Sequence, residues 1–135
     1  MKITKEEDYA VTFLVALAKH YNKGYLGLHE ISKKYSLPEM FLKQIAQKLK
    51  KTGYLKVKEG RGGGYKLAKP TKQISLDEIL KVFNPQPFLT SCSDCHGQKT
   101  CGIYDKCQTR KNWEQVSDTI YKQLGSISVE KLAEK

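Results

Sequence analysis

The sequence has no hydrophobic run long enough to span a membrane. Its longest strongly apolar stretch runs from Val11 to Ala18, and acidic residues occupy positions 6 to 8 just before it. A membrane helix needs about 20 apolar residues, and a secretory signal opens with basic ones. We therefore expect no membrane partner and a cytoplasmic location. Thiols stay reduced there, so cysteines are expected to bind metal or react rather than form disulfides.

Catalytic arrangements are also missing. We find no Ser/His/Asp set, no paired carboxylates and no nucleotide-cradling loop. The glycine run at residues 62–64 is not followed by the Lys-Ser or Lys-Thr pair of a P-loop. The chain is therefore not expected to be an enzyme.

Acidic residues are few relative to basic ones. There are 14 Asp and Glu against 24 Lys and Arg, which gives a formal charge of +10 over 135 residues. This balance indicates a polyanionic partner, most often nucleic acid, although a lysine-rich surface also serves solubility. The length suits one hydrophobic core with an oligomerisation element, and is too short for two ordinary domains.

Apolar residues at helical spacing predict five helices. The first starts near Tyr9 and ends around residues 22–24, a short second covers 28–35, and a third follows the turn at Pro38 and stops at Gly53. A fourth is expected over 74–83 and a last one around 113–124. Between the third and fourth, alternating runs at 54–58 and 65–67 flank a glycine-rich tip, which predicts a β-hairpin.

Two helices at a tight turn followed by a hairpin indicate a winged helix-turn-helix. The expected fold is mainly α with a small β-hairpin wing, followed by a long C-terminal dimerisation helix. In this fold the second helix of the pair enters the major groove and the wing reaches the backbone or the minor groove. The predicted DNA-binding residues are Glu39, Lys43, Gln44, Gln47 and Lys48 on the helix, and Arg61 at the wing tip.

The chemistry of these side chains differs. Gln44 suits adenine and Lys43 suits guanine, whereas Lys48 is expected on a phosphate. Arg61 stands on a flexible glycine tip, where a guanidinium can enter a narrow minor groove. For any single lysine, a solvated surface charge remains an open alternative.

The last helix carries a narrow apolar stripe. Its members are Trp113, Val116, Ile120 and Leu124, which are three, four and four residues apart. This spacing is typical of a helix that packs against another helix.

All four cysteines lie between residues 92 and 107, and the last three form a C-x5-C-x5-C pattern. Zinc favours two tight ligand pairs, and only Cys92 and Cys95 make one. A redox C-x-x-C would need a βαβ setting, which is absent. An iron-sulfur cluster needs thiolates on a pliable polar loop, and without the ferredoxin spacing it would be a sensor. We favour the cluster, and zinc or free thiols remain the alternative.

The chain resembles the IscR/NsrR family of bacterial winged-helix repressors (the Rrf-two type) over nearly all of its length. The motifs that carry the resemblance are Asp8-Tyr9-Ala10, Pro38 with Phe41-Leu42-Lys43-Gln44-Ile45, Gly63-Gly64-Tyr65-Lys66-Leu67, Ile74-Ser75-Leu76 and the C-x5-C-x5-C segment. The resemblance implies a homodimer held by the C-terminal helix on a palindromic double-stranded DNA operator. It also implies a cluster bound by Cys95, Cys101 and Cys107.

The fourth cluster ligand separates the branches of that family. The IscR-like branch has a histidine three residues after the last cysteine, where this chain has Arg110. The NsrR-like branch has an acidic residue at the start of the first helix, and Asp8 stands there. The resemblance thus implies Asp8 of the partner subunit on a [4Fe-4S] cluster, in preference to [2Fe-2S]. Cys92 is the alternative fourth ligand, because iron-sulfur clusters prefer soft thiolates.

These features predict three segments. Residues 1–84 form the winged helix-turn-helix domain, 85–108 the cysteine-rich cluster-binding loop, and 109–135 the dimerisation helix and tail. The expected function is a DNA-binding transcriptional repressor that senses nitric oxide, redox state or iron-sulfur status through the cluster. The alternative is a regulator of the same fold that senses through zinc or free cysteine thiols.

Overall fold

The computed structural model describes residues 2–85 and 102–134. Its first helix, α1 (Lys5–Lys19), begins four residues before the expected start at Tyr9. The cause is a capping box, in which the Glu7 backbone N–H donates to the Thr4 hydroxyl and the Glu7 carboxylate accepts from the Thr4 backbone N–H at 2.8 Å. These bonds satisfy backbone donors that would otherwise lack partners at the helix start.

The helix-turn-helix is formed by α2 (Leu28–Tyr35) and α3 (Glu39–Lys50), which confirms the two predicted helices. The turn depends on Ser36, which has a left-handed φ of 54°. The hydroxyl of Ser32 donates to the carbonyl of Leu37 at 2.5 Å and closes the turn from inside. The angle between the two helices is therefore fixed by local bonds as well as by packing.

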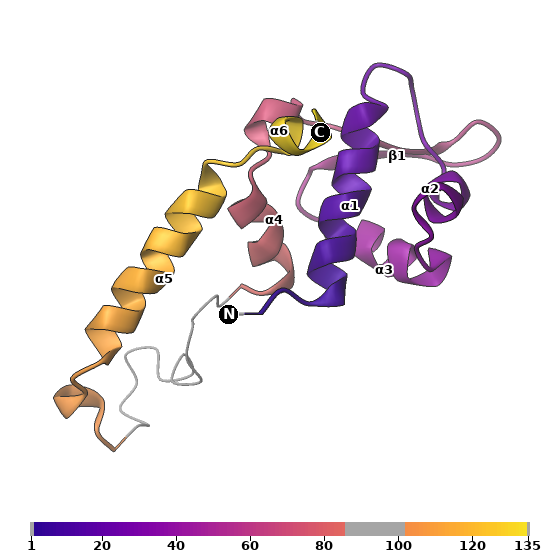
Figure 1. Cartoon of the computed structure of the whole chain (residues 1–135). Coiled ribbons are helices and arrows are strands. Elements are labelled where there is room, and N and C mark those ends of the chain that lie inside the picture. The colour runs from indigo at the N-terminus through magenta and orange to yellow at the C-terminus, as the bar shows by residue number, and fades with distance from the viewer. Residues whose placement is uncertain (1, 86–101, 135) are drawn as a thin grey trace.

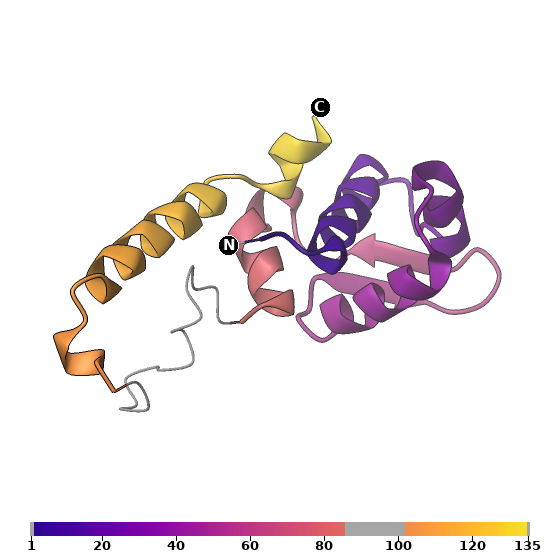
Figure 2. The same cartoon turned by 60° about the horizontal axis from the view of Figure 1, so that its bottom comes forward.

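The predicted hairpin consists of β1 (Leu55–Lys58) and β2 (Gly64–Leu67), paired antiparallel in the register Leu55↔Leu67 to Lys58↔Gly64. A segment before α2 adds to its free edge. Leu26 donates its N–H to the Tyr65 carbonyl at 2.8 Å and accepts from the Tyr65 N–H at 2.9 Å. The segment before α2 is thereby held against β2. Figures 1 and 2 both show the hairpin loop extending away from the helices.

The C-terminal residues return to the core of the winged-helix domain. A 3-10 turn (Thr71–Gln73) leads to α4 (Leu76–Phe83), and α6 (Val129–Ala133) packs against α1 and that turn. The Leu76 N–H donates to the Ile127 carbonyl, and the Val129 N–H donates to the Ile74 carbonyl, both at 2.8 Å. The sequence predicts a tail after the dimerisation helix, whereas Val129 in this stretch is completely buried.

The long helix α5 (Arg110–Gly125) follows a short 3-10 turn (Tyr104–Lys106). It contacts α4 at its C-terminal end and extends as an arm from the rest of the molecule (Figures 1 and 2). The fold is therefore mainly helical with a two-stranded wing, as predicted. In the part of the chain that the structure describes, no helix has the length and hydrophobicity to cross a membrane.

One core unites α1, α2, α3, α4, α6 and the hairpin. The largest fully buried side chains are Phe13, Leu14, Leu17, Ile31, Leu42, Ile45, Leu49, Ile74, Ile79 and Val129. Aromatic rings extend this core at its edges, because Tyr9 meets Phe41 edge-on at 5.4 Å and Phe13 meets Tyr65 at 5.8 Å between centroids.

Candidate DNA interface and metal ligands

The helix α3 presents its polar side to solvent. Leu42, Ile45, Ala46 and Leu49 are buried, and the predicted base-reading residues Lys43, Gln44 and Gln47 are exposed. This division follows from helical spacing, because one face of α3 packs on α1 and α2. The structure therefore places these three predicted residues together on one accessible face.

The first turn of α3 holds two further side chains on this side. The carboxylate of Glu39 lies 3.3 Å from Nδ1 of His29, in the first turn of α2, and both side chains are exposed. Met40, which is not among the residues predicted to bind DNA, is 74% exposed. Met40 could have been identified from the sequence as an apolar residue that lies off the core-facing positions of α3. An apolar side chain there can contact the methyl group of thymine.

Lys48 has a different environment from the one predicted. Its ammonium forms an ion pair with Glu6 in the first turn of α1 and lies 5.4 Å from the centre of the Phe83 ring, at the end of α4. The side chain is still 48% exposed. The structure thus gives Lys48 contacts that tie α3 to α1 and α4, and its predicted phosphate contact stays a prediction.

The hairpin tip exposes Arg61, as expected for a side chain that reaches DNA. The glycines beside it serve the backbone. A side chain at Gly63 would collide with the carbonyl of Lys58, and one at Gly64 would collide with the carbonyl of Leu26. Gly64 also has a φ of +143°, which other residues rarely adopt. These positions therefore require glycine for the close approach of neighbouring backbone.

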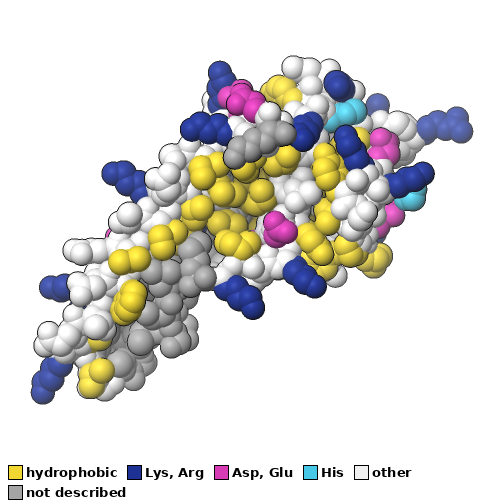
Figure 3. All heavy atoms as spheres, viewed as in Figure 1, with side chains coloured by type: hydrophobic (Ala, Val, Ile, Leu, Met, Phe, Trp, Pro, Cys, Tyr) yellow, Lys and Arg dark blue, Asp and Glu magenta, His cyan; other side chains and the backbone are white. Residues whose placement is uncertain are grey.

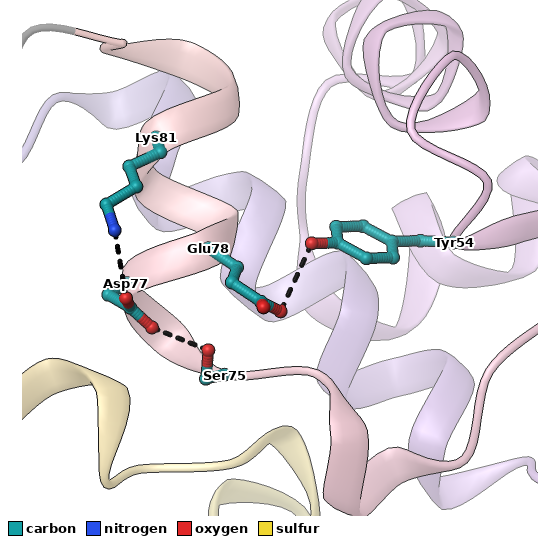
Figure 4. Close-up of polar contacts among 5 residues, drawn as sticks. All are labelled: Tyr54, Ser75, Asp77, Glu78 and Lys81. Carbon is teal, nitrogen blue, oxygen red and sulfur yellow. Dashed lines mark hydrogen bonds and ion pairs between the residues drawn. The ribbon is translucent and has the colours of Figure 1, made fainter.

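The joint between the hairpin and α4 is polar (Figure 4). The hydroxyl of Tyr54, just before β1, donates to the carboxylate of Glu78 at 3.2 Å. Burial, with the charge of Glu78, raises the pKa of Tyr54 to about 12. In the same helix turn, Ser75 donates to Asp77 at 2.5 Å and Lys81 donates to Asp77 at 3.2 Å. The bond from Tyr54 to Glu78 joins the wing to α4, the helix that leads to the cysteine-rich segment, and the two bonds to Asp77 stabilise α4 itself.

Of the predicted metal ligands, Asp8 and Cys107 lie in the described residues. Asp8 is exposed in the first turn of α1, and its carbonyl accepts a bond from the Thr12 hydroxyl at 3.0 Å. Cys92, Cys95 and Cys101 lie outside the described residues. Within residues 2–85 and 102–134, no three His, Cys, Asp or Glu side chains converge in a way that could hold a metal ion.

Cys107 lies just before α5, and its sulfur is 3.7 Å from the hydroxyl of Thr109. Hydrogen bonds from the Thr109 N–H, the Thr109 hydroxyl and the Arg110 N–H, in that order, lower the pKa of the Cys107 thiol. The thiolate is the form that binds metals and reacts. The N-terminus of α5 therefore favours the thiolate form of the partly exposed Cys107 side chain, which fits a ligand of an iron-sulfur cluster or of zinc.

The predicted dimerisation stripe is accessible in this chain. Trp113 is 47% and Val116 is 43% exposed, and Ile120 and Leu124 are half-buried. Figure 3 shows hydrophobic side chains along the α5 arm and across the middle of the molecule, next to α4. An apolar surface of this kind on a small protein usually marks an interaction site.

A helix-turn-helix with an exposed polar second helix and a glycine-tipped wing defines a DNA-binding transcriptional regulator. Comparison with known proteins agrees. Residues 3–135 match the Rrf2 family, described as iron-dependent transcriptional regulators, and the chain belongs to this family. It is a transcriptional regulator rather than an enzyme, as expected.

Individual relatives extend this result. The chain is 32% identical to the HTH-type transcriptional regulator IscR of Photorhabdus laumondii subsp. laumondii, over 98% of this chain and 79% of that protein. Among solved structures, IscR of T. potens has a TM-score of 0.78 at 28% identity, covering 99% of this chain and 87% of that one. CymR of B. subtilis has a TM-score of 0.82 at 24% identity, with 99% and 97% covered, and this likeness shows the fold.

Proposed function

We propose that this protein is a homodimeric transcriptional repressor that binds a palindromic operator and senses nitric oxide, redox state or iron-sulfur status through an iron-sulfur cluster. The observation that carries the proposal is the position of Cys107. This thiol, whose pKa is lowered, lies just before α5, whose apolar stripe exposes Trp113 and Val116. A ligand at this point joins the sensing group directly to the dimerisation helix.

The proposed dimer forms through the α5 stripe. Pairing two copies removes Trp113 and Val116 from water, and burial of such side chains stabilises association. Two-fold symmetry then presents two α3 helices to half-sites one helical turn apart. This arrangement explains why a palindromic operator is the expected partner.

The proposed ligands are Cys95, Cys101 and Cys107, completed by Asp8 of the partner subunit. Asp8 suits this role because it is exposed at the start of α1. Cys92 is the alternative fourth ligand. When bound, a [4Fe-4S] cluster would supply a redox- and nitric oxide-reactive centre, and its carboxylate-bound iron would be the accessible one.

Contacts in this chain support a coupling between the ligands and the recognition helix. Lys48 of α3 pairs with Glu6, two residues before Asp8, and lies on Phe83, the last residue of α4 before the cysteine-rich segment. A movement of either the start of α1 or the end of α4 would therefore displace Lys48, and with it α3. A change of a few kcal/mol in the favoured dimer geometry would alter operator occupancy by orders of magnitude.

The test is the iron, sulfide and visible absorbance of protein purified without oxygen, with operator affinity measured before and after removal of the cluster. We expect a brown protein whose absorbance is lost in Asp8→Ala and kept in Cys92→Ala. The reverse pattern would make Cys92 the ligand. Equal operator affinity of the two forms would refute cluster sensing.

A regulator that senses through zinc or free thiols is the second candidate. It is favoured by the same lowered pKa of Cys107, because a stabilised and partly exposed thiolate reacts readily with oxidants. A colourless protein that contains zinc, or that contains no metal and loses DNA affinity on thiol oxidation, would support this candidate over the cluster.

A further inference from the structure

Three lysines gather on the outer face of the wing. Lys56 and Lys66 stand directly opposite each other in the β1–β2 register, and Lys58 follows two pairs further toward the tip, on the same face of the hairpin. Like charges directly opposite on a hairpin destabilise it. In the part of the chain that the structure describes, no carboxylate forms an ion pair with any of the three. This cluster is therefore suited to an anion that comes from outside the chain.

Tyr25 holds two of these lysines in place. The ammonium of Lys66 lies 4.8 Å, and that of Lys58 5.9 Å, from the centre of the Tyr25 ring. Cation–π contacts of this length attract each ammonium to the ring. They also restrict two flexible side chains before any partner binds, which reduces the entropy lost on binding.

The ring itself is fixed by the backbone. Tyr25 precedes Leu26, which exchanges two hydrogen bonds with Tyr65 of β2. This pairing places residue 25 beside residue 66 at the edge of the hairpin, and the close approach requires glycine at position 64. The ring and the lysines of both strands thus form one surface, which we call the Tyr25 platform (Tyr25, Lys56, Lys58 and Lys66).

The platform lies between the two elements that would enter DNA grooves. Lys58 is three residues before Arg61 at the wing tip, and Tyr25 is three residues before Leu28, where α2 starts. The contact of His29 with Glu39 puts the start of α2 beside the start of α3. With α3 in the major groove and the wing in the adjacent minor groove, the phosphate strand that separates the grooves must pass between them.

We propose that the Tyr25 platform binds the phosphates of this strand. The lysines neutralise phosphate charge, and the Tyr25 hydroxyl donates a hydrogen bond to a phosphate oxygen, a contact that carries no sequence information. The inference rests on the proposed DNA-binding function and adds a site that fixes the position of the domain on the duplex.

The test is equilibrium binding to a labelled duplex, selected by the wild-type protein from a random library, over a range of salt concentrations. Its variant is Lys58→Gln with Lys66→Gln, which removes two charges and keeps side chains of similar shape. Each phosphate contact contributes about 0.9 to the slope of log affinity against log salt, so the slope should fall by about 1.8 for each bound subunit, or about 3.6 for the proposed dimer. At ~0.1 M salt the affinity should fall by tenfold or more, equally on selected and scrambled duplexes.

The matched control is Lys72→Gln with Lys122→Gln, which removes the same charge from exposed positions in the 3-10 turn and in α5. Its slope should stay close to the wild type. Tyr25→Phe should lower affinity a few-fold without a change in slope, because it removes a donor and no charge. Equal slopes for the platform variant and the control would overturn the inference.

The experiment distinguishes a failure of the Tyr25 platform from a failure of the proposed sensing function. A reduced slope in the platform variant, with equal affinities of the cluster-bound and cluster-free proteins, would support the platform and refute sensing. A wild-type protein that binds no duplex would refute DNA binding itself and the inference with it.

Discussion

Replacing Val129 with alanine should destabilise the whole winged-helix domain, although the residue lies only six positions before Lys135, the last residue of the sequence. Val129 is completely buried, and its N–H donates to the carbonyl of Ile74 at 2.8 Å. The substitution keeps this backbone bond and removes only the two methyl groups. The expected loss in the free energy of unfolding therefore measures how much the packing of α6 contributes to the core around α1.

The size of the effect follows from burial. Two buried methyl groups at about 0.8 kcal/mol each give ~1.6 kcal/mol. The cavity they leave adds up to about 1 kcal/mol if the surroundings do not collapse. We expect the free energy of unfolding to fall by roughly 2 kcal/mol, measured by urea denaturation at one fixed protein concentration, because any dimer makes stability depend on concentration.

Lys131→Ala in the same helix is the control. Lys131 is exposed, and its ammonium donates to the carbonyl of Ser126 at 3.2 Å, so the change should stay within about 0.5 kcal/mol. If Val129→Ala were as mild as this control, α6 would not be part of the core. A loss limited to a local unfolding signal, with the main transition unchanged, would lead to the same conclusion.

Three other results are expected. Tyr54→Phe should lower the free energy of unfolding by about 1 kcal/mol at neutral pH, the value of one hydrogen bond. Because folding raises the pKa of Tyr54 from 10.0 to about 12, the wild type should lose stability between pH 10 and 12 more steeply than this variant, as measured by urea unfolding at a series of pH values. The rate of Cys107 alkylation in metal-free protein, followed by mass spectrometry of its peptide, should rise with pH around a midpoint below that of an ordinary thiol. Thr109→Val should raise this midpoint because the hydrogen bond from the hydroxyl is lost, and an unchanged midpoint would contradict the proposed stabilisation. Gly64→Ala should lower the free energy of unfolding by about 2 kcal/mol or more, since the methyl group meets backbone and φ is positive, whereas stability like the wild type would show that the hairpin edge can move.

The helix-turn-helix could be predicted from the sequence because its signals are local. Apolar spacing in 28–35 and 41–49 and the glycine-rich tip are read within a few residues of each other. The early start of α1 does not follow from apolar spacing, because the capping pair that sets it, Thr4 and Glu7, is polar. The helix α6 was missed because five residues show no periodicity, and its stability comes from contacts with α1 and Ile74.

In the candidate site, too, features that depend on local sequence could be predicted and features that depend on long-range packing could not. Exposure of Lys43, Gln44 and Gln47 follows from helical spacing and was predicted. The pairing of Lys48 with Glu6 joins residues 42 positions apart and depends on how α3 crosses α1, which no local pattern encodes. The Tyr25 platform was equally invisible, because a tyrosine before α2 meets the lysines of the wing only through the backbone pairing of its neighbour.

The attachment of α5 has a mechanical consequence. Its 16 residues span ~24 Å. One end is fixed to the start of α4 by the main-chain bond from Leu76 to Ile127, and Cys107 stands at the other. The helix α5 is therefore attached at one end to the winged-helix domain, and a displacement of the Cys107 end would rotate it about that attachment. A sideways shift of ~1 Å at Cys107 would rotate α5 by about 2.4° about its attached end, and a shift of about 2 Å would rotate it by ~5°. Displacements on the scale of a single metal–ligand bond at one end would thus change the angle at which the whole domain meets its partner.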